Sequence, residues 1–214
     1  MADLLPQNFP TPTESAIVTY DFADVLSRTG YITFYVVGGD NSSSLFLSPI
    51  VIESDSEKYS TERASTGTTE LDIDLTFNVA QTIKGRLFTA LSYTAYGGNG
   101  VGTAVVEPKV RIYHVTSGGT ETEIGTQQTL TSISQGSAAS YTDTREMAEF
   151  NIAEKRFAIG EKLRLNIEFI ATIGTNTTAT LWHDGANRDI TGRDFLNTAL
   201  PTDIKVLVPF MVVT

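Results

Sequence analysis

The sequence predicts an all-β protein, an antiparallel two-sheet sandwich of the jelly-roll type, and three observations carry the prediction. From Tyr31 onward apolar and polar residues alternate with a period of two, most regularly in 71–77 and 163–169, a pattern typical of half-buried strands. Glycine-rich turn clusters separate these runs too closely for crossover helices. One polar face per strand indicates antiparallel sheets, and short hairpins mixed with longer connections favour a jelly roll over an up-and-down barrel.

The chain begins with a predicted extended arm, residues 1–15. Its three prolines remove backbone donors and favour an extended conformation. We expect this arm to dock on a neighbouring protein, with the contacts made by Leu4, Leu5, Pro6, Phe9 and Pro10. The remaining residues, 16–214, show no internal repeat and no composition change at which to place a boundary, so they are expected to form a single domain.

A short helix is predicted just before the first strand, over residues 21–28. Asp21 is a suitable N-cap, three apolar residues follow at Phe22, Val25 and Leu26, and Gly30 can end the helix. No later segment has a long period of 3.6 residues, so we expect helix to be confined to this region.

Ten strands are then predicted from alternation and β-propensity. They cover residues 31–37, 45–52, 71–77, 85–93, 105–115, 124–133, 147–152, 163–169, 178–182 and 203–213. The segments 55–69 and 134–144, rich in small and polar residues, are expected to be surface loops. The glycines between Gly98 and Gly102 lack the following helix and Lys-Ser/Thr pair of a phosphate-binding loop, which favours a hairpin loop.

Composition removes several function classes. The chain has 25 acidic and 15 basic residues and a formal net charge of −10, which disfavours binding to nucleic acid or to an anionic membrane surface. It has no cysteine and only two histidines, so thiolate chemistry and the common zinc centres are excluded. The start of the chain lacks the pattern of a secretory signal, and its longest apolar stretch is far below the roughly 20 residues of a spanning helix. We expect no cofactor, no metal, no nucleic-acid partner and no membrane association.

Two sets of residues offer chemistry, and each has a plainer interpretation. Asp72 and Asp74 lie about 7 Å apart on one strand face, a spacing compatible with the carboxylate pair of a glycan hydrolase. Basic residues also recur two apart, at Lys84/Arg86, Lys109/Arg111 and Lys162/Arg164, so cross-strand charge pairs on a solvated face explain the same pattern. His114 lies within a predicted strand and is interpreted as a strand histidine with one hydrogen-bonded nitrogen.

The polar turn after the only tryptophan is the candidate contact loop. It contains Trp182, His183, Asp184, Asn187, Arg188 and Asp189. An arginine, two carboxylates and an amide within a few residues suit recognition of a glycan or of a protein neighbour. The alternative is a structural loop in which Asp184 and Asn187 bind nearby backbone and Arg188 pairs with an acid. The acidic segment 53–57 could hold calcium through oxygen ligands, but it lacks the EF-hand order.

Several short motifs resemble a known group of proteins. These motifs are Asp21-Phe-Ala-Asp-Val25, Thr29-Gly-Tyr-Ile-Thr-Phe-Tyr35, Glu123-Ile-Gly-Thr126, Gly160-Glu-Lys-Leu-Arg-Leu165, His183-Asp-Gly-Ala-Asn-Arg188 and Val208-Pro-Phe210. Together they resemble β-sandwich structural proteins of tailed phages and related archaeal viruses, over most of the chain. The resemblance implies a virion setting and supplies no catalytic residue.

The sequence therefore predicts a non-enzymatic virion protein. We expect a capsid decoration or auxiliary protein, made in the host cytoplasm, that binds the major capsid protein or another virion protein at the outer surface. A homotrimer is expected, because closed assembly protects exposed strand edges and virion β-modules resemble this plan. A receptor- or glycan-binding module of a tail or head fibre is the alternative, and a glycan hydrolase is the third choice.

Overall fold

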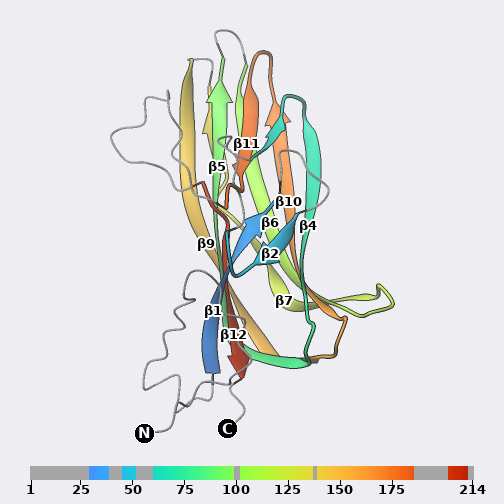
Figure 1. Ribbon diagram of the computed structural model, residues 1–214. Coiled ribbons are helices and arrows are strands. Elements are labelled where there is room, and N and C mark those ends of the chain that lie inside the picture. The colour runs from blue at the N-terminus through green and yellow to red at the C-terminus, as the bar shows by residue number, and fades with distance from the viewer. Residues whose placement is uncertain are drawn as a thin grey trace, which may run out of the picture.

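The computed structural model describes residues 29–38, 45–51, 60–98, 102–136, 139–185 and 202–211. All regular structure in these residues is β-strand, which confirms the predicted all-β class (Figure 1). The predicted arm, the predicted helix over 21–28 and the acidic segment 53–57 lie outside the described residues. No helix long and apolar enough to cross a membrane occurs in the part of the chain that the structure describes.

The described residues form strands that all join one mixed sheet. The strands are β1 (Thr29–Val37), β2 (Phe46–Ser48), β3 (Ser60–Arg63), β4 (Gly67–Thr76), β5 (Gln81–Gly97), β6 (Ala104–Val115), β7 (Glu121–Thr129), β8 (Ile133–Gln135), β9 (Ser140–Phe157), β10 (Lys162–Ile173), β11 (Thr178–Trp182) and β12 (Lys205–Met211). The strand order is β3-β11-β5-β12-β1-β2-β4-β10-β6-β7, with β8 paired to β6 and β9 paired to β5. Pairing is antiparallel except between β2 and β4, which meet in parallel where Phe46 faces Asp74.

Two long strands organise the sheet. β5 pairs along one edge with β9 and along the other edge with β11 and then β12. β10 lies between β4 and β6 and pairs with both over most of its length. Burial alternates strictly along most of β6, as the period of two in its sequence predicts for a strand with one covered face.

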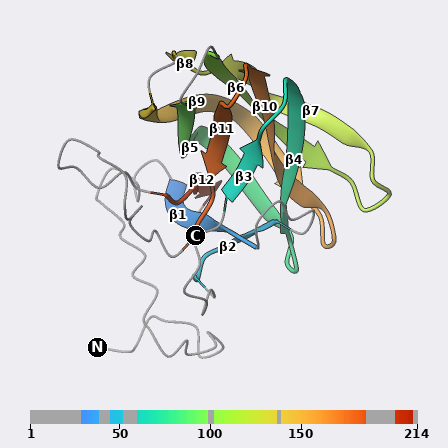
Figure 2. The same ribbon diagram turned by 90° about the horizontal axis from the view of Figure 1, so that it is seen from above.

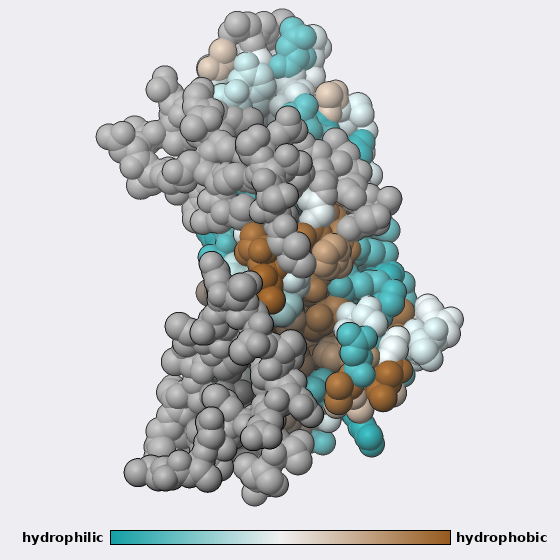
Figure 3. Space-filling view, viewed as in Figure 1, coloured by the Kyte–Doolittle hydropathy of each residue, from teal (hydrophilic) through white to brown (hydrophobic). Residues whose placement is uncertain are grey.

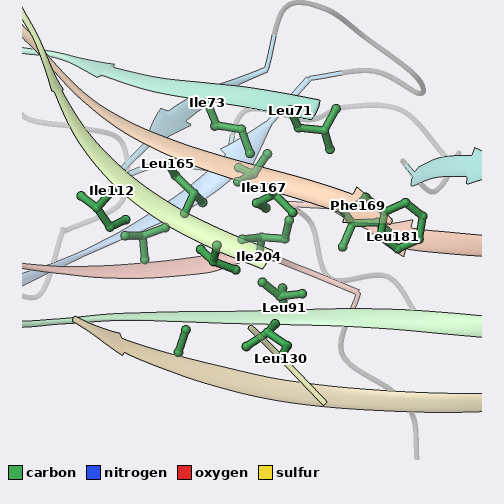
Figure 4. Packing of buried hydrophobic residues seen from close by; sticks show 14 of the residues in the cluster. Leu71, Ile73, Leu91, Ile112, Leu130, Leu165, Ile167, Phe169, Leu181 and Ile204 are labelled. Atoms are coloured by element: carbon green, nitrogen blue, oxygen red, sulfur yellow. The ribbon is translucent and has the colours of Figure 1, made fainter. Parts of the chain in front are cut away.

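The hydrophobic core lies between these two groups of strands. Seen from above, the strands curve around the core and do not lie in one plane (Figure 2). In close view, Leu71, Ile73, Leu165 and Ile167 from β4 and β10 point toward Leu91 of β5 (Figure 4). This single buried cluster includes residues from β1, β2, β4, β5, β6, β8, β9, β10, β11 and β12.

The two predicted surface loops were wrong in part. Residues 60–63 form β3 and residue 67 begins β4, whereas 133–135 form β8 and residue 140 begins β9. Both segments are polar, so they lack the apolar alternation that marks a strand in sequence. Their backbone groups are instead paired with neighbours, β3 with β11 and β8 with β6, because buried or half-buried peptide groups need hydrogen-bond partners whatever the side chain.

The hairpin predicted at Gly98–Gly102 was also wrong. β5 and β6 on either side of it are not paired, so this connection joins two separate parts of the sheet. Its glycines permit a close backbone approach to residues 174–177, since a Cβ on Gly98 would lie 1.7 Å from the Asn176 carbonyl oxygen and one on Gly102 would lie 2.3 Å from that of Thr175. Gly98 and Gly102 thus allow the β5–β6 connection to pack against the β10–β11 connection.

Candidate functional site

A cluster of buried polar side chains lies where β3, β5, β9 and β11 meet the start of β12. We call it the polar cluster; it comprises Thr61, Ser92, Thr94, His183, Asp184, Thr202 and Asp203, which are all buried, together with Asp143 and Arg145. Such a concentration of polar groups inside an apolar fold requires internal hydrogen bonds, because burial of an unpaired polar group is costly.

Trp182 forms one side of the polar cluster. It is the last residue of β11, and its indole Nε1 donates a hydrogen bond of 2.8 Å to Thr94 Oγ1 on β5. The Thr94 hydroxyl in turn donates to the carboxylate of Asp143 on β9. This chain of hydrogen bonds ties three neighbouring strands together through their side chains as well as their backbones.

The two residues after Trp182 continue the same network. His183 Nε2 lies 3.1 Å from Thr61 Oγ1 on β3, which is a buried hydrogen bond. The Asp184 backbone N–H donates to the Thr202 carbonyl oxygen at 3.0 Å. The chain leaving β11 is therefore fastened to β3 on one side and to the segment entering β12 on the other.

An ion pair completes the polar cluster. Arg145 Nη1 of β9 lies 3.0 Å from Asp203 Oδ1, and Lys205 Nζ lies 2.9 Å from Asp203 Oδ2. The Asp203 side chain is only 1% exposed. A buried carboxylate needs such cationic partners, because leaving it unpaired in the interior would be strongly unfavourable.

The predicted contact loop is only partly described, and the described part is buried. Trp182, His183 and Asp184 are 6%, 0% and 0% exposed, so they offer almost no surface for direct contact with a glycan or a protein. Asn187, Arg188 and Asp189 lie outside the described residues, as do the predicted docking residues Leu4, Leu5, Pro6, Phe9 and Pro10. The side-chain bonds of the structural alternative therefore stay a prediction, since Asn187 and Arg188 are not described.

Thr61 and His183 together resemble part of a nucleophile–base pair, a hydroxyl beside an imidazole. Both are buried, and Thr61 is 3% exposed, so no substrate can approach its oxygen in this arrangement. The Asp184 N–H is also occupied by Thr202. The geometry suits a structural hydrogen bond. Sequence reasoning missed Thr61 because it lies in the polar segment interpreted as a loop.

The carboxylate pair Asp72 and Asp74 belongs to an ion-pair network on the outer face of β4 and β10. Arg164 Nε and Nη2 donate to the two oxygens of Asp74 at 2.7 and 3.0 Å, and Arg164 Nη1 donates to Asp72 at 2.9 Å. Lys162 Nζ adds a bond of 2.9 Å to Asp74, and Asn166 Nδ2 adds one of 2.8 Å to Asp72. Glu121 of β7 also accepts from Arg164 at 2.6 Å.

This network sets the protonation of Asp74. Burial alone would raise the pKa of the Asp74 carboxyl, but hydrogen bonds and charges from Arg164 and Lys162 outweigh burial and hold that pKa below its usual value. The hydrogen bond to Asp74 likewise raises the pKa of Arg164. A glycosidase acid needs a raised pKa so that it carries a proton, and Asp74 has the opposite shift. The interpretation as cross-strand charge pairs fits this geometry.

The other charged pairs follow the same plan. Lys84 pairs with Glu154 at 3.1 Å and Arg86 with Glu149 at 3.2 Å across β5 and β9, and Arg111 pairs with Glu168 at 3.3 Å across β6 and β10. His114 Nε2 lies 2.9 Å from Glu161 Oε2, which confirms the prediction of a hydrogen-bonded strand histidine. A hydrogen bond from the Ala158 N–H, and then one from His114, lowers the pKa of Glu161.

An apolar groove of about 410 Å³ lies at a different place, between β1, β12 and the turn from β4 to β5. Its lining residues are Ile32, Phe34, Leu75, Thr76, Phe77, Asn78, Val79, Gln81, Phe210 and Met211, none of them charged. Figure 3 shows hydrophobic surface gathered in the lower half of this face of the molecule.

Among the described residues no three histidine, aspartate or glutamate side chains are placed to hold a metal ion.

No protein-family model matches the chain, and no curated protein matches it. Among solved structures, a CocE/NonD family hydrolase from Staphylococcus aureus aligns at 9% identity with a TM-score of 0.45, over 85% of this chain and 37% of the hydrolase. An α-amino acid ester hydrolase aligns at 9% identity with a TM-score of 0.47, over 84% of this chain and 36% of the enzyme. Infectious bursal disease virus, Gx strain, aligns at 12% identity with a TM-score of 0.20, over 83% of this chain and 41% of the viral chain. The chain thus spans well under half the length of each protein.

Proposed function

We propose that this protein is an auxiliary structural protein of a virion, a capsid decoration protein that binds the outer capsid surface without catalysis. The proposal joins three supports. They are the resemblance of its short motifs to virion β-sandwich proteins, the proline-rich arm before an all-β domain, and the internal use of its charged side chains. The major capsid protein is the proposed partner, and the assembled form is a homotrimer.

The observation that carries the proposal is that the candidate catalytic side chains are held in hydrogen bonds and ion pairs within the protein. Asp72 and Asp74 are held by Arg164, His114 by Glu161, and His183 by Thr61. A catalytic acid, base or nucleophile must be able to reach a substrate and change its protonation. Side chains committed to internal ion pairs and buried hydrogen bonds instead stabilise a rigid domain, which is what a surface-binding structural protein needs.

The finer fold assignment is part of the same proposal. We infer that the curved sheet acts as a two-sheet sandwich, with β4, β6 and β10 in one layer and β5, β9 and β11 in the other. The apolar side chains that point inward from both groups support this, as layers of strands must cover one another's apolar faces. A jelly-roll connection remains the expected plan for the complete domain.

The arm supplies the proposed contact with the capsid. Fifteen extended residues span at most about 50 Å, so the arm can cross onto a neighbouring subunit. A specific contact buries on the order of 1,600 Å² in total, which the arm and one end of the domain can share. Copies linked in a trimer also raise one another's effective concentration on the lattice, so a weak individual contact can persist.

A full-length variant with Leu4, Leu5 and Phe9 all changed to serine tests this role. We expect it to keep the far-ultraviolet circular dichroism of the wild type and to be lost from purified particles, as counted by mass spectrometry. The matched control changes Thr11, Thr13 and Glu14 to serine and should be incorporated normally. Protease or antibody treatment of particles should reach the wild-type protein from outside; a protein found inside the shell, or only at the tail tip, would contradict the proposal.

No described feature favours the glycan-binding alternative. That function requires an open loop around Trp182, and the described residues of the loop, Trp182 to Asp184, are buried. Binding of the wild type to a glycan array, abolished by Arg188→Ala, would favour the fibre-tip function over capsid decoration.

A further inference from the structure

We propose that the apolar groove is a vacant strand position in the sheet, which accepts an extended, uncharged segment of another protein as an added strand beside β1. The inference does not depend on the virion role. It rests on the registers of β1, β2 and β4, on the backbone groups that β1 and β4 direct toward the groove, and on the exposure of the chain that follows β2.

The short strand β2 lies between β1 and β4 in the sheet and covers only one end of the space between them. It has three residues, runs antiparallel to β1 and runs parallel to β4. Its last residue, Ser48, pairs with Tyr35 of β1, and its first residue, Phe46, pairs with Asp74 of β4. Beyond Ser48 no described strand lies between β1 and β4.

The groove occupies the place where β2 would continue. Extended by three residues in the same registers, β2 would run between residues 32–34 of β1 and residues 77–79 after β4. The groove is lined by residues 32 and 34 on the first side and by residues 77, 78 and 79 on the second. The groove is therefore where the sheet has room for a further strand.

β1 directs a backbone donor and acceptor toward this position. The Val36 N–H donates to the Ile204 carbonyl oxygen, on the β12 side, at 3.2 Å. Peptide groups of successive residues in a strand point to opposite edges. The N–H and C=O of Thr33, three residues before Val36, therefore point away from β12 and toward the groove. No described strand pairs with Thr33 on that edge.

The end of β4 does the same from the other side. The Phe77 N–H donates to the Glu161 carbonyl oxygen at 3.0 Å, and the Phe77 carbonyl accepts from the Gly160 N–H at 2.8 Å. Both bonds lie on the β10 side, so the peptide groups of Thr76 point to the opposite edge, at which Asp74 meets β2. No described strand pairs with Thr76 there. Such strand edges are ready to bind an added strand.

The chain's own continuation from β2 does not fill the groove. Pro49 follows β2, and proline has no N–H to donate to a sheet. The next residues, Ile50 and Val51, are 49% and 37% exposed and do not line the groove. In the described part of the chain the alternating apolar runs are already strands of its own sheet. A second copy therefore has no described segment to donate without unfolding, and we assign the groove to a different protein.

The groove defines the chemistry of the added strand. Residues directly opposite in an antiparallel pair place their side chains on the same face. Ile32 and Phe34 line the groove, and no lining residue carries a charge, so the partner residues opposite these two are apolar. The partner residue between them lies opposite Thr33, exchanges two backbone hydrogen bonds with it and can be polar. Main-chain bonds then supply affinity, and alternate side chains supply specificity.

A synthetic peptide tests the proposal with the full-length protein. The peptide alternates threonine and valine over seven residues, with threonine at both ends and blocked, uncharged termini. We expect saturable binding by fluorescence anisotropy and exchange of the Thr33 and Thr76 amides about fivefold slower in the complex. The control peptide is N-methylated on its threonines, which removes the donors that would face β1, and it should bind about tenfold more weakly.

Three variants of the protein locate the contact. Val79→Ser removes an apolar side chain from the rim of the groove and should weaken peptide binding about threefold. Ile159→Ser is the matched control and should bind like the wild type, because Ile159 is 70% exposed, as Val79 is 65% exposed, and does not line the groove. Thr33→Pro removes only the N–H directed at the groove and should abolish the preference for the unmethylated peptide, with the circular dichroism of the wild type retained.

Several results would overturn the proposal. One is the lack of saturable binding, and another is equal binding of the two peptides by the wild type, which would mean apolar contact without strand addition. Slower exchange along β9 in place of Thr33 would put the added strand on a different edge. A Thr33 amide that exchanges as slowly in the protein alone as in the complex would mean that this chain or a second copy already fills the position.

Discussion

At the scale of single residues, Gly125 shows how closely two strands of this fold approach. Gly125 is a buried residue of β7. A Cβ added to it would lie 3.0 Å from Phe150 Cδ1 and 3.1 Å from Ile152 Cδ1, both on β9. The absence of a side chain at this position therefore lets β7 pack directly on the apolar side chains of β9.

The first prediction concerns this contact. Gly125→Ala should lower the free energy of unfolding by about 1–3 kcal/mol, because the added methyl group overpacks a filled core. The measurement is urea-induced unfolding followed by tryptophan fluorescence. Gly118→Ala is the matched control, since its Cβ would meet no atom closer than 3.9 Å, and it should be neutral or slightly stabilising. Equal stability of both variants would mean that β9 can move aside.

The second prediction concerns Asp74, whose pKa is lowered in the folded protein. A group with a lowered folded-state pKa stabilises the fold above its unfolded-state pKa, about 3.9 for aspartate. This stabilisation is lost as the pH falls through the folded-state pKa. Asp74→Asn should therefore lower the free energy of unfolding by about 1.5–3 kcal/mol at pH 7, because the amide makes weaker hydrogen bonds with Arg164 and Lys162. Below about pH 4 the free energy of unfolding of the variant should fall less steeply with pH than that of the wild type.

Unfolding by urea at pH 7 and at pH 3 measures both parts of this prediction. Glu154→Gln is the control, because Glu154 pairs with Lys84 at the surface and its side chain is 57% exposed; such pairs contribute about 0–1 kcal/mol. If the Asp74→Asn variant loses stability as steeply as the wild type when the pH falls from 7 to 3, the ion pairs of Arg164 with Asp74 do not cause the loss of stability in acid.

At the scale of elements, β3 depends on its neighbour more than on its own sequence. It is a short polar strand that pairs only with β11 among the described strands. Thr61, its buried residue, makes a buried hydrogen bond with His183. Edge strands of this kind have little apolar burial to hold them, so a single buried hydrogen bond has a large share in keeping β3 on the sheet.

The third prediction follows from that bond. Thr61→Val keeps the shape of the side chain but removes the hydroxyl, which should destabilise the fold by about 1–3 kcal/mol because the buried imidazole loses a partner. Hydrogen exchange should also accelerate in residues 60–63 before the rest of the sheet. Thr129→Val on the exposed end of β7 is the control and should change neither quantity. Global loss of protection without local opening at β3 would contradict the prediction.

At the scale of the whole molecule, an unpaired strand edge suggests how copies of the chain assemble. β9 has 18 residues and pairs only with β5 among the described strands. Long strand edges are templates for pairing with other chains unless they are covered or charged. Met147 on β9 is 64% exposed, which makes this strand a natural place for contact between copies.

The fourth prediction is that the protein is a homotrimer at micromolar concentration. Sedimentation equilibrium should give three times the mass of one chain, and Met147→Lys should reduce it by placing a charge in the interface. Glu154→Gln, at another exposed position of the same strand, is expected to leave the mass unchanged. A monomeric mass for the wild type in solution and on the particle would exclude the trimer.

Alternation of apolar and polar residues was enough to predict the all-β class and most of the strands that cover the core, although β9 extends well beyond the predicted 147–152. β11 begins and ends where the sequence predicts, at Thr178 and Trp182, and β6 differs at its start by one residue, Ala104. The position of β6 follows from local pattern because a strand that covers a core presents an apolar side chain at every second position. β11 is buried at four consecutive positions, so its β-propensity indicated it instead.

The pairing of the strands and the burial of polar groups could not be predicted from local pattern. The polar strand β3, the burial of Trp182 and His183, and the close packing at Gly125 all depend on residues distant in sequence. Nothing in the local pattern distinguishes a threonine that faces water from Thr61, which faces an imidazole 122 positions later in the chain. A hydrogen bond or a close packing contact needs two residues, and here the order of strands in the sheet brings together two residues that are distant in sequence.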